Sequence, residues 1–327
     1  GKKIEKGKVL RMDTTVIETN ISYPVDARLL WDSIRVLTRI MEACQKVLPL
    51  AVGSGKAELT FHFAKRTRRS KKLCYAIVMA KGPQADTRRK KLYRALLKVA
   101  HEVVTMARAC GEEVTRSTHP KALECSAFLD HYLTLACKVI DQCERRVLKE
   151  EKVPSSEKIV SIFEEHTDII KRGKSQSPTE FGHKVLFATG ESGLITYYET
   201  FRGNPSDSGM ITEVLSTHYA QYGRAPHSLS GDRRFFSAAN EHMAYGSGVQ
   251  NVCINKPGYR CKARKELERE TWFKKLKRFR AGIEGIISTL MRSFGLSRCL
   301  WKGWESFRSY VGLAVVTFNL RKIAALI

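Results

Sequence analysis

Residues 9–19, "VLRMDTTVIET", are rich in β-branched side chains and predict a β-strand. Asp13 lies at the centre of this stretch, where a buried strand ordinarily carries an apolar residue. From Asp26 to about Glu151 the apolar residues recur with the helical period of about 3.6, which predicts a bundle of four or five helices. The first strand is therefore followed directly by a long helical segment.

Short strands return after this helical segment. "KIVSIF" (158–163) predicts one strand, and "HKVLFATGESGLITYYETF" (183–201) predicts a hairpin. Residues 207–223 predict a helix, and residues 227–235 and 251–255 predict two more strands with a helix between them. Because strands alternate with helices, we predict an α/β core that is interrupted after its first strand by a helical insertion.

These patterns divide the chain into three segments. Residues 1–24 hold the first strand of the core, residues 25–152 form the helical insertion, and residues 153–327 form the rest of the core and the C-terminal helices. Since the sequence begins at Gly1 rather than methionine, we expect a further module, with sequence-specific DNA-binding function, to precede it.

The composition is strongly basic. The 327 residues include 57 lysines and arginines against 33 acidic residues, a net charge of +24. This excess predicts a polyanionic partner, most simply nucleic acid; an acidic protein partner is the alternative. Thirteen cations lie between Lys65 and Lys98 with the single acid Asp86, and a second cluster spans Arg260 to Arg280. The first cluster fits a solvated helix face equally well.

Several other functions are not predicted. The nine cysteines contain no CxxC pair, so a structural zinc site is not expected, and we interpret them as reduced thiols of a cytoplasmic protein. No run of 18 apolar residues predicts a membrane span. The "GSGK" motif at 53–56 lacks the first glycine and the final Ser or Thr of a phosphate-binding loop, so ATP binding is not predicted.

A second acid stands out in "FRAGIEGIISTLMRSFG" (279–295), which predicts an amphipathic helix. Glu284 lies between Gly282 and Gly285, although each glycine costs a helix interior about 1 kcal/mol relative to alanine. We interpret the glycines as making room for a large group, such as a metal-bound phosphate.

Asp232, at the end of "HSLSGD", is the third acid at a position where an apolar residue is expected. Clustered carboxylates bind Mg²⁺, and two ions held about 4 Å apart stabilise the attacking and leaving oxygens of phosphoryl transfer. Each acid also has a structural interpretation. Asp13 fits an edge strand, Asp232 fits a turn or cap, and Glu284 fits an ion pair with Arg280 at i−4.

Several blocks of the sequence resemble bacterial insertion-sequence transposases of the DDE type, especially the ISNCY group. They are "MDTTVIETNISYPVDARLLWD", "IFEEHTDIIKRGK", "FGHKVLFATGESGLI", "GNPSDSGM", "QYGRAPHSLSGD" and "FRAGIEGIISTLMRSFGLSRCLWKG". The resemblance implies a ribonuclease-H-like fold, with a mixed five-stranded sheet flanked by helices and, here, a large all-helical insertion after the first strand. It also implies that Asp13, Asp232 and Glu284 are the catalytic acids and the metal ligands.

The resemblance further implies the reaction and its partners. DNA would be cleaved at transposon ends with two Mg²⁺ ions, which Mn²⁺ can replace, and the freed 3′ hydroxyl would attack target DNA. No other cofactor is implied. The expected assembly is a homodimer or a larger synaptic complex, located on the nucleoid in the bacterial cytoplasm.

The supporting residues depart from the family pattern of Tyr, two residues, Arg, three residues, Glu, six residues, Lys. Arg280 and Glu284 fit, but Lys277 takes the Tyr position and Met291 the Lys position, with Arg292 one residue further on. We expect Lys277, Arg280 and Arg292 to contact DNA. Together with the "RRFF" that follows Asp232, these departures leave one alternative, a degenerate or repurposed transposase that binds DNA without cutting it.

Other polar residues have simpler interpretations. His166 with Asp168, and His183 with Lys184, are expected to form hydrogen bonds within the fold rather than to contact DNA. Asn204 and Asp207, in the "GNPSDS" block, are interpreted as a turn and a helix cap.

Overall fold

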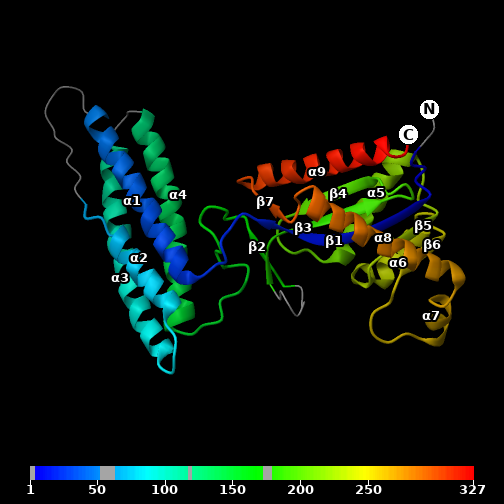
Figure 1. The fold of residues 1–327 in the computed structure, drawn as a ribbon, viewed down its shortest axis with the longest axis horizontal. Coiled ribbons are helices and arrows are strands. Elements are labelled where there is room, and N and C mark those ends of the chain that lie inside the picture. The colour runs from blue at the N-terminus through cyan, green and yellow to red at the C-terminus, as the bar shows by residue number, and fades with distance from the viewer. Residues whose placement is uncertain (1–3, 52–62, 117–119, 172–178) are drawn as a thin grey trace. The chain divides into compact units, whose positions relative to one another are not determined.

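The computed structural model describes residues 4–51, 63–116, 120–171 and 179–327, so the "GSGK" motif lies outside the described residues. The chain divides into two compact units (Figure 1). One unit comprises Gly1–Asn20 with His166–Ile327 and contains the sheet, and the other comprises Ile21–Glu165 and is helical.

Strand β1 (Val9–Thr19) is the strand predicted from the β-branched stretch, and it lies in the interior of the sheet. It pairs antiparallel with β3 (Thr179–Thr189) on one side and parallel with β5 (Ser228–Gly231) on the other. Its side chains alternate between two apolar layers, since Leu10 packs in one layer and Ile17 in the other. Because both faces of the sheet are covered, nearly every residue of β1 is buried.

The sheet is mixed. Beyond β3 lies the antiparallel strand β4 (Ile195–Phe201), and beyond β5 lies the parallel strand β6 (Asn251–Ile254), so five strands run in the order β4-β3-β1-β5-β6. Two short strands add to it: β2 (Asp168–Lys171) pairs with the start of β3, and β7 (Arg298–Cys299) with the end of β1. The described sheet therefore has seven strands. Five of them form the continuous order β4-β3-β1-β5-β6, which is compatible with the five-stranded mixed sheet that the resemblance implies, and the two short strands β2 and β7 are additional.

Helices cover both faces of the sheet (Figure 1). On one face pack α5 (Ile211–Tyr222), which follows the 3₁₀ turn η2 (Asp207–Met210), and α6 (Ala238–Gly246), which follows the 3₁₀ turn η3 (Arg233–Phe235). On the other face pack α8 (Thr271–Ser293), preceded by the short α7 (Lys262–Leu267), and α9 (Trp304–Ala324). The apolar face of the amphipathic helix predicted over residues 279–295 provides this contact, because Ile283 and Leu290 are fully buried in that layer.

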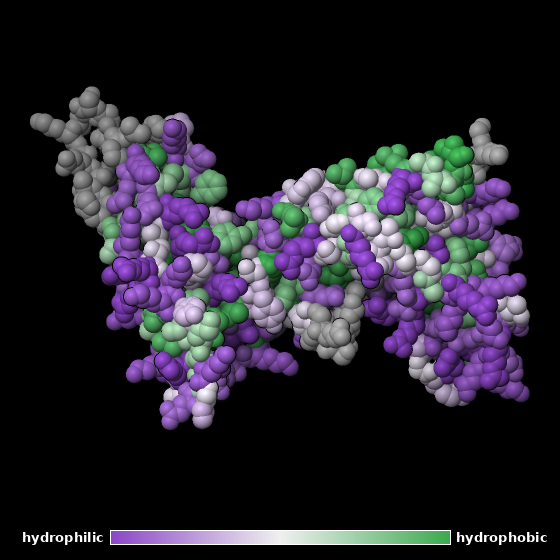
Figure 2. All heavy atoms as spheres, in the orientation of Figure 1, coloured by the Kyte–Doolittle hydropathy of each residue, from purple (hydrophilic) through white to green (hydrophobic). Residues whose placement is uncertain are grey.

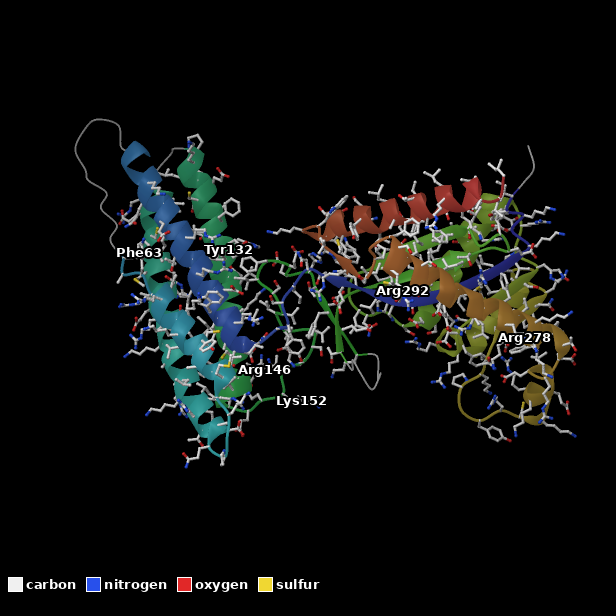
Figure 3. All side chains as sticks on the ribbon, viewed as in Figure 1. Phe63, Tyr132, Arg146, Lys152, Arg278 and Arg292 are labelled. Carbon is white, nitrogen blue, oxygen red and sulfur yellow. The ribbon has the colours of Figure 1, made fainter. Side chains whose placement is uncertain are left out.

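The helical unit has its own apolar core. Its helices are α1 (Asp26–Ala51), α2 (Thr67–Met79), α3 (Ala85–Thr115) and α4 (Pro120–Cys143), and the π-helical turn η1 (Glu144–Leu148) continues α4. Buried side chains from all four α-helices form one cluster, as the period of 3.6 predicts. Arg146, labelled in Figure 3, donates to both carboxylate oxygens of Asp26 at 2.9 and 2.8 Å. Within the described residues, no helix is long and apolar enough to span a bilayer.

The "KIVSIF" segment is not a strand, which corrects the prediction. Ile162 is 3% exposed and packs in the core of the helical unit. The backbone N–H of Ile159 donates to the Gln142 side chain of α4 at 2.8 Å, so a helix side chain takes the place of a neighbouring strand. The helical unit of the structure accordingly extends to Glu165, whereas the segment bounds given from the sequence, 25–152, stay a prediction.

Candidate active site

Asp13 lies at the middle of β1 with only 8% of its surface exposed, on the same face of the strand as Ile17. Its Oδ1 accepts a hydrogen bond from the backbone N–H of Thr14 at 2.8 Å, and its Oδ2 accepts one from Arg280 Nη1 at 3.2 Å. Burial raises the pKa of Asp13, and these two donors oppose the rise. Because β1 is an interior strand, the interpretation of Asp13 as an edge residue was wrong.

Asp232 directly follows β5, which runs parallel to β1 and pairs with its first half. Its Oδ1 accepts from the backbone N–H of Arg233 at 2.7 Å and caps η3, and its Oδ2 accepts from Arg234 Nε at 3.3 Å. The charge of Asp232 also raises the pKa of Asp13, behind the larger effect of burial. The two aspartates therefore interact electrostatically across neighbouring parallel strands.

Glu284 lies on α8, which packs against β1, and its side chain is 62% exposed. Its Oε1 accepts from Arg280 Nη2 at 2.7 Å, one turn earlier on the helix. Arg280 thus bridges Asp13 and Glu284 with two nitrogens of one guanidinium. The ion pair with Arg280 and the cap formed by Asp232, both considered from the sequence, are present.

The donor chemistry of these acids fits a hard cation such as Mg²⁺, because all three supply carboxylate oxygens. In the structure, two of these acids, Asp13 and Glu284, are joined through Arg280. Within the residues that the structure describes, no three His, Cys, Asp or Glu side chains form a group that could hold a metal ion. The guanidinium of Arg280 lies between two of the three acids, so those carboxylates would converge on a cation only after Arg280 moves.

The two glycines beside Glu284 differ in their surroundings. A side chain at Gly282 would collide with Nη1 of Arg11, whereas a Cβ at Gly285 would meet nothing within 4 Å. Arg11 donates from Nη1 to the carbonyl oxygen of Phe279 at 2.6 Å and lies 4.3 Å above the Phe279 ring. Gly282 therefore makes room for an internal arginine, and only Gly285 leaves open space as the sequence interpretation expected.

A buried acid beside the site was not identified as such from the sequence. Asp207 is 5% exposed; its Oδ1 accepts from Lys184 Nζ at 2.8 Å and its Oδ2 from Thr14 Oγ1 at 3.2 Å. Arg234 Nε lies 3.5 Å from the same Oδ2. Asp207 is the first residue of η2, whose N-cap is Ser206, so the interpretation of Asp207 as a helix cap was wrong. Its carboxylate instead joins Thr14, the residue after Asp13, to Arg234 of η3. A lysine in the middle of a buried strand, Lys184, was the available signal.

The three predicted DNA contacts lie along α8. Lys277 and Arg280 line a pocket of about 360 Å³ beside Asp232, and Lys277 is exposed. Arg292 is exposed near the C-terminal end of the helix, as Figure 3 shows. Met291, at the Lys position of the family pattern that the resemblance implies, is partly buried and packs against the apolar layer between α8, α9 and the sheet. This contact with the apolar layer explains the apolar residue at that position.

The histidines form hydrogen bonds within the fold, as expected. His183 is fully buried and shares hydrogen bonds with His166 at 2.7 Å and with the Asp168 carboxylate at 2.8 Å. The two rings stack with centroids 4.9 Å apart, and Trp304 packs edge-on against His183. This network of hydrogen bonds and ring contacts joins β2, β3 and α9, and none of its described contacts involves Asp13, Asp232 or Glu284.

The comparison with protein families matches part of the chain. Residues 247–324 match the family model described as Transposase DDE domain, which supports a DDE transposase. The matched segment runs from β6 through α9 and contains Arg280 and Glu284, whereas Asp13 and Asp232 precede it. Searches of the curated proteins and of the solved structures each found no match.

Proposed function

We propose that this chain is a DDE transposase of a bacterial insertion sequence, similar to the ISNCY group, which cleaves transposon ends and joins them to target DNA. The observation that carries the proposal is the convergence on Arg280 of Asp13, from the central strand, and Glu284, from the helix of the matched segment. Asp232 adds its charge from the neighbouring parallel strand. The strand order β4-β3-β1-β5-β6 supports a ribonuclease-H-like core that carries the helical unit as an insertion.

In this proposal Asp13, Asp232 and Glu284 hold the divalent cations, two Mg²⁺ ions or Mn²⁺ in their place. When bound, such ions supply Lewis-acid stabilisation of negative charge on the phosphate oxygens. The chain itself contributes position and charge. The hydrogen bonds of Thr14 and Arg233 orient Asp13 and Asp232, and the Asp207 network joins the two segments that bear them.

In this proposal Arg280 exchanges its carboxylate partners for a DNA phosphate when DNA binds. In the described arrangement it neutralises Asp13 and Glu284, and a DNA phosphate offers its guanidinium an equally good bidentate acceptor. On phosphate, Arg280 would stabilise the charge that develops during the displacement, and Lys277 and Arg292 would hold the neighbouring backbone without reading bases. DNA binding would thus free two carboxylates at the moment when the substrate arrives.

The helical unit would supply further DNA contacts. Between Lys65 and Lys98 most cations are exposed, and Figure 2 shows hydrophilic residues gathered over α2 and α3. These cations would grip DNA that flanks the cleaved bond, or line the contact between two protomers of a synaptic homodimer or larger assembly. The proposed location of the protein is the nucleoid, because its DNA substrate lies there.

The test is cleavage of DNA that carries the ends of the element encoding this chain, with Mg²⁺ or Mn²⁺, by the wild type and by Asp13→Asn and Glu284→Gln. We expect the wild type to cut and both variants to bind DNA without cutting it. If the wild type binds end DNA and leaves it intact with either metal, the alternative of a DNA-binding protein derived from a transposase replaces this proposal.

A further inference from the structure

The pocket beside Asp232 is concave, small and strongly basic. It lies where β5 and β6 end, has a volume of about 360 Å³, and is lined by five cations and one acid. The cations are Arg233, Lys256, Arg260, Lys277 and Arg280, and the acid is Asp232. The part of the surface around α7 and the start of α8 is correspondingly hydrophilic in Figure 2. Like charges around one cavity repel each other until an anion enters it.

Three of these cations have no acidic partner among the residues that the structure describes. Arg260 pairs with Glu268 at 2.9 Å, and Arg280 pairs with the acids of the active site. Arg233, Lys256 and Lys277 form no ion pair with any described residue. Their charges are therefore available to a ligand.

The wall that carries Lys256 and Arg260 is held in place by one buried carboxylate. Glu268 accepts hydrogen bonds from the Asn255 side chain, the Lys256 backbone N–H, Arg260 and Arg264, at 2.9 to 3.1 Å. Burial by itself raises the pKa of Glu268, but these donors outweigh it and lower the pKa. Four donors on one acid fix the loop before any ligand arrives, so the pocket is preorganised.

We propose that this pocket binds one nucleotide of the DNA strand through its phosphate, next to the phosphate that lies at the catalytic acids. The inference rests on the proposed function, because Asp232 and Arg280 belong both to the pocket and to the active site. A strand whose reacting phosphate lies at the acids places its neighbouring nucleotide at the pocket mouth. The volume lies within the range of about 300 to 1,000 Å³ that is usual for small-ligand pockets.

The experiment measures binding of thymidine 3′,5′-bisphosphate to the full chain by calorimetry, in EDTA, with thymidine and inorganic phosphate as comparison ligands. We expect the bisphosphate to bind more tightly than inorganic phosphate, and thymidine not to bind. Lys256→Ala and Lys277→Ala should each weaken bisphosphate binding roughly tenfold, the size expected for one lost charge-assisted contact. The matched control is Lys275→Ala, which removes the same charge from an exposed position of α8 outside the pocket.

Three results would overturn the proposal. Thymidine binding as tightly as the bisphosphate would show that the phosphate is not recognised. An equal loss in the control would show general attraction by a basic surface, and unchanged binding in both pocket variants would place the bisphosphate elsewhere. Because the measurement needs neither metal nor cleavage, a chain that fails to cut DNA can still bind the bisphosphate, and the two proposals fail separately.

Discussion

At the scale of single residues, the site depends on buried charges that are paired. Lys184 and Asp207 are 7% and 5% exposed, and each is the other's ionic partner at 2.8 Å. Lys184 also donates to the carbonyl oxygen of Pro205 at 2.6 Å. An ion removed from water in this way is stable only while its partner remains. The pair therefore joins β3 to η2, and Asp207 also accepts a hydrogen bond from Thr14, the residue after Asp13.

We expect Asp207→Asn to lower the free energy of unfolding by about 3 kcal/mol, because it leaves Lys184 charged, buried and without an anionic partner. Urea unfolding at neutral pH measures the change. The matched control is Asp86→Asn, which breaks an ion pair with Arg89 whose acid is 90% exposed. The control should cost less than about 1 kcal/mol. Equal losses in the two variants would show that burial does not decide the cost.

At the scale of elements, helix α8 combines an apolar face with the acid and cations of the site. Ile283 and Leu290 anchor it to the sheet, and this fixes Arg280 and Glu284 at the edge of the buried layer. Arg11 of β1 crosses to α8 at the point where Gly282 leaves room. Strand and helix are therefore joined by an arginine from each side, Arg11 toward the helix and Arg280 toward the strand.

The two glycines of α8 allow a paired test of this contact. Gly285→Ala should stabilise the protein by roughly 0.5 to 1 kcal/mol, because alanine favours the helix and meets open space. Gly282→Ala should instead destabilise it by about 1 kcal/mol, since the helix gain is outweighed when Arg11 is pushed from the Phe279 carbonyl oxygen. Thermal unfolding of both variants provides the measurement. Stabilisation by both would mean that Arg11 adjusts without loss.

At the scale of the whole molecule, the cations that give the net charge of +24 differ in whether they are paired within the fold. Some cations of the helical unit are already paired within the fold, such as Arg66 with Glu102 at 3.1 Å. Others on the exposed surface of α2, including Arg68, Arg69 and Lys72, form no ion pair with a described residue. Only unpaired cations can exchange solvent for DNA phosphate without first breaking an internal contact.

This difference predicts the salt dependence of DNA binding. Replacing Arg68, Arg69 and Lys72 together by glutamine should reduce the slope of log K against log salt by about 2 to 3, because each lost phosphate contact lowers it by about 0.9. Fluorescence anisotropy with duplex DNA over a salt series gives the slope. The matched control replaces three paired cations of the same unit, Lys65, Arg66 and Arg89. A control slope that falls as far would contradict a DNA-binding role specific to the unpaired cations.

Local patterns in the sequence were sufficient for the main elements. The β-branched run predicted β1, the period of 3.6 predicted the helices of the helical unit, and the amphipathic pattern around Glu284 predicted that α8 buries one face. Such patterns are readable because each depends on residues a few positions apart. The three acids were singled out for the same reason, since each interrupts a local apolar pattern. Their roles as metal ligands remain a prediction.

Contacts between distant residues were decided only by the tertiary structure. The short strands β2 and β7 are formed by pairing with β3 and β1. Residues 158–163, "KIVSIF", do not form a strand, because a side chain of α4 takes the hydrogen bond that a neighbouring strand would supply. Arg280 reaches Asp13 across 267 positions, and Asp207 reaches Thr14 across 193. Such pairs leave no periodic pattern in the sequence, because their members are far apart along the chain. They make contact, and are removed from water, only in the folded protein.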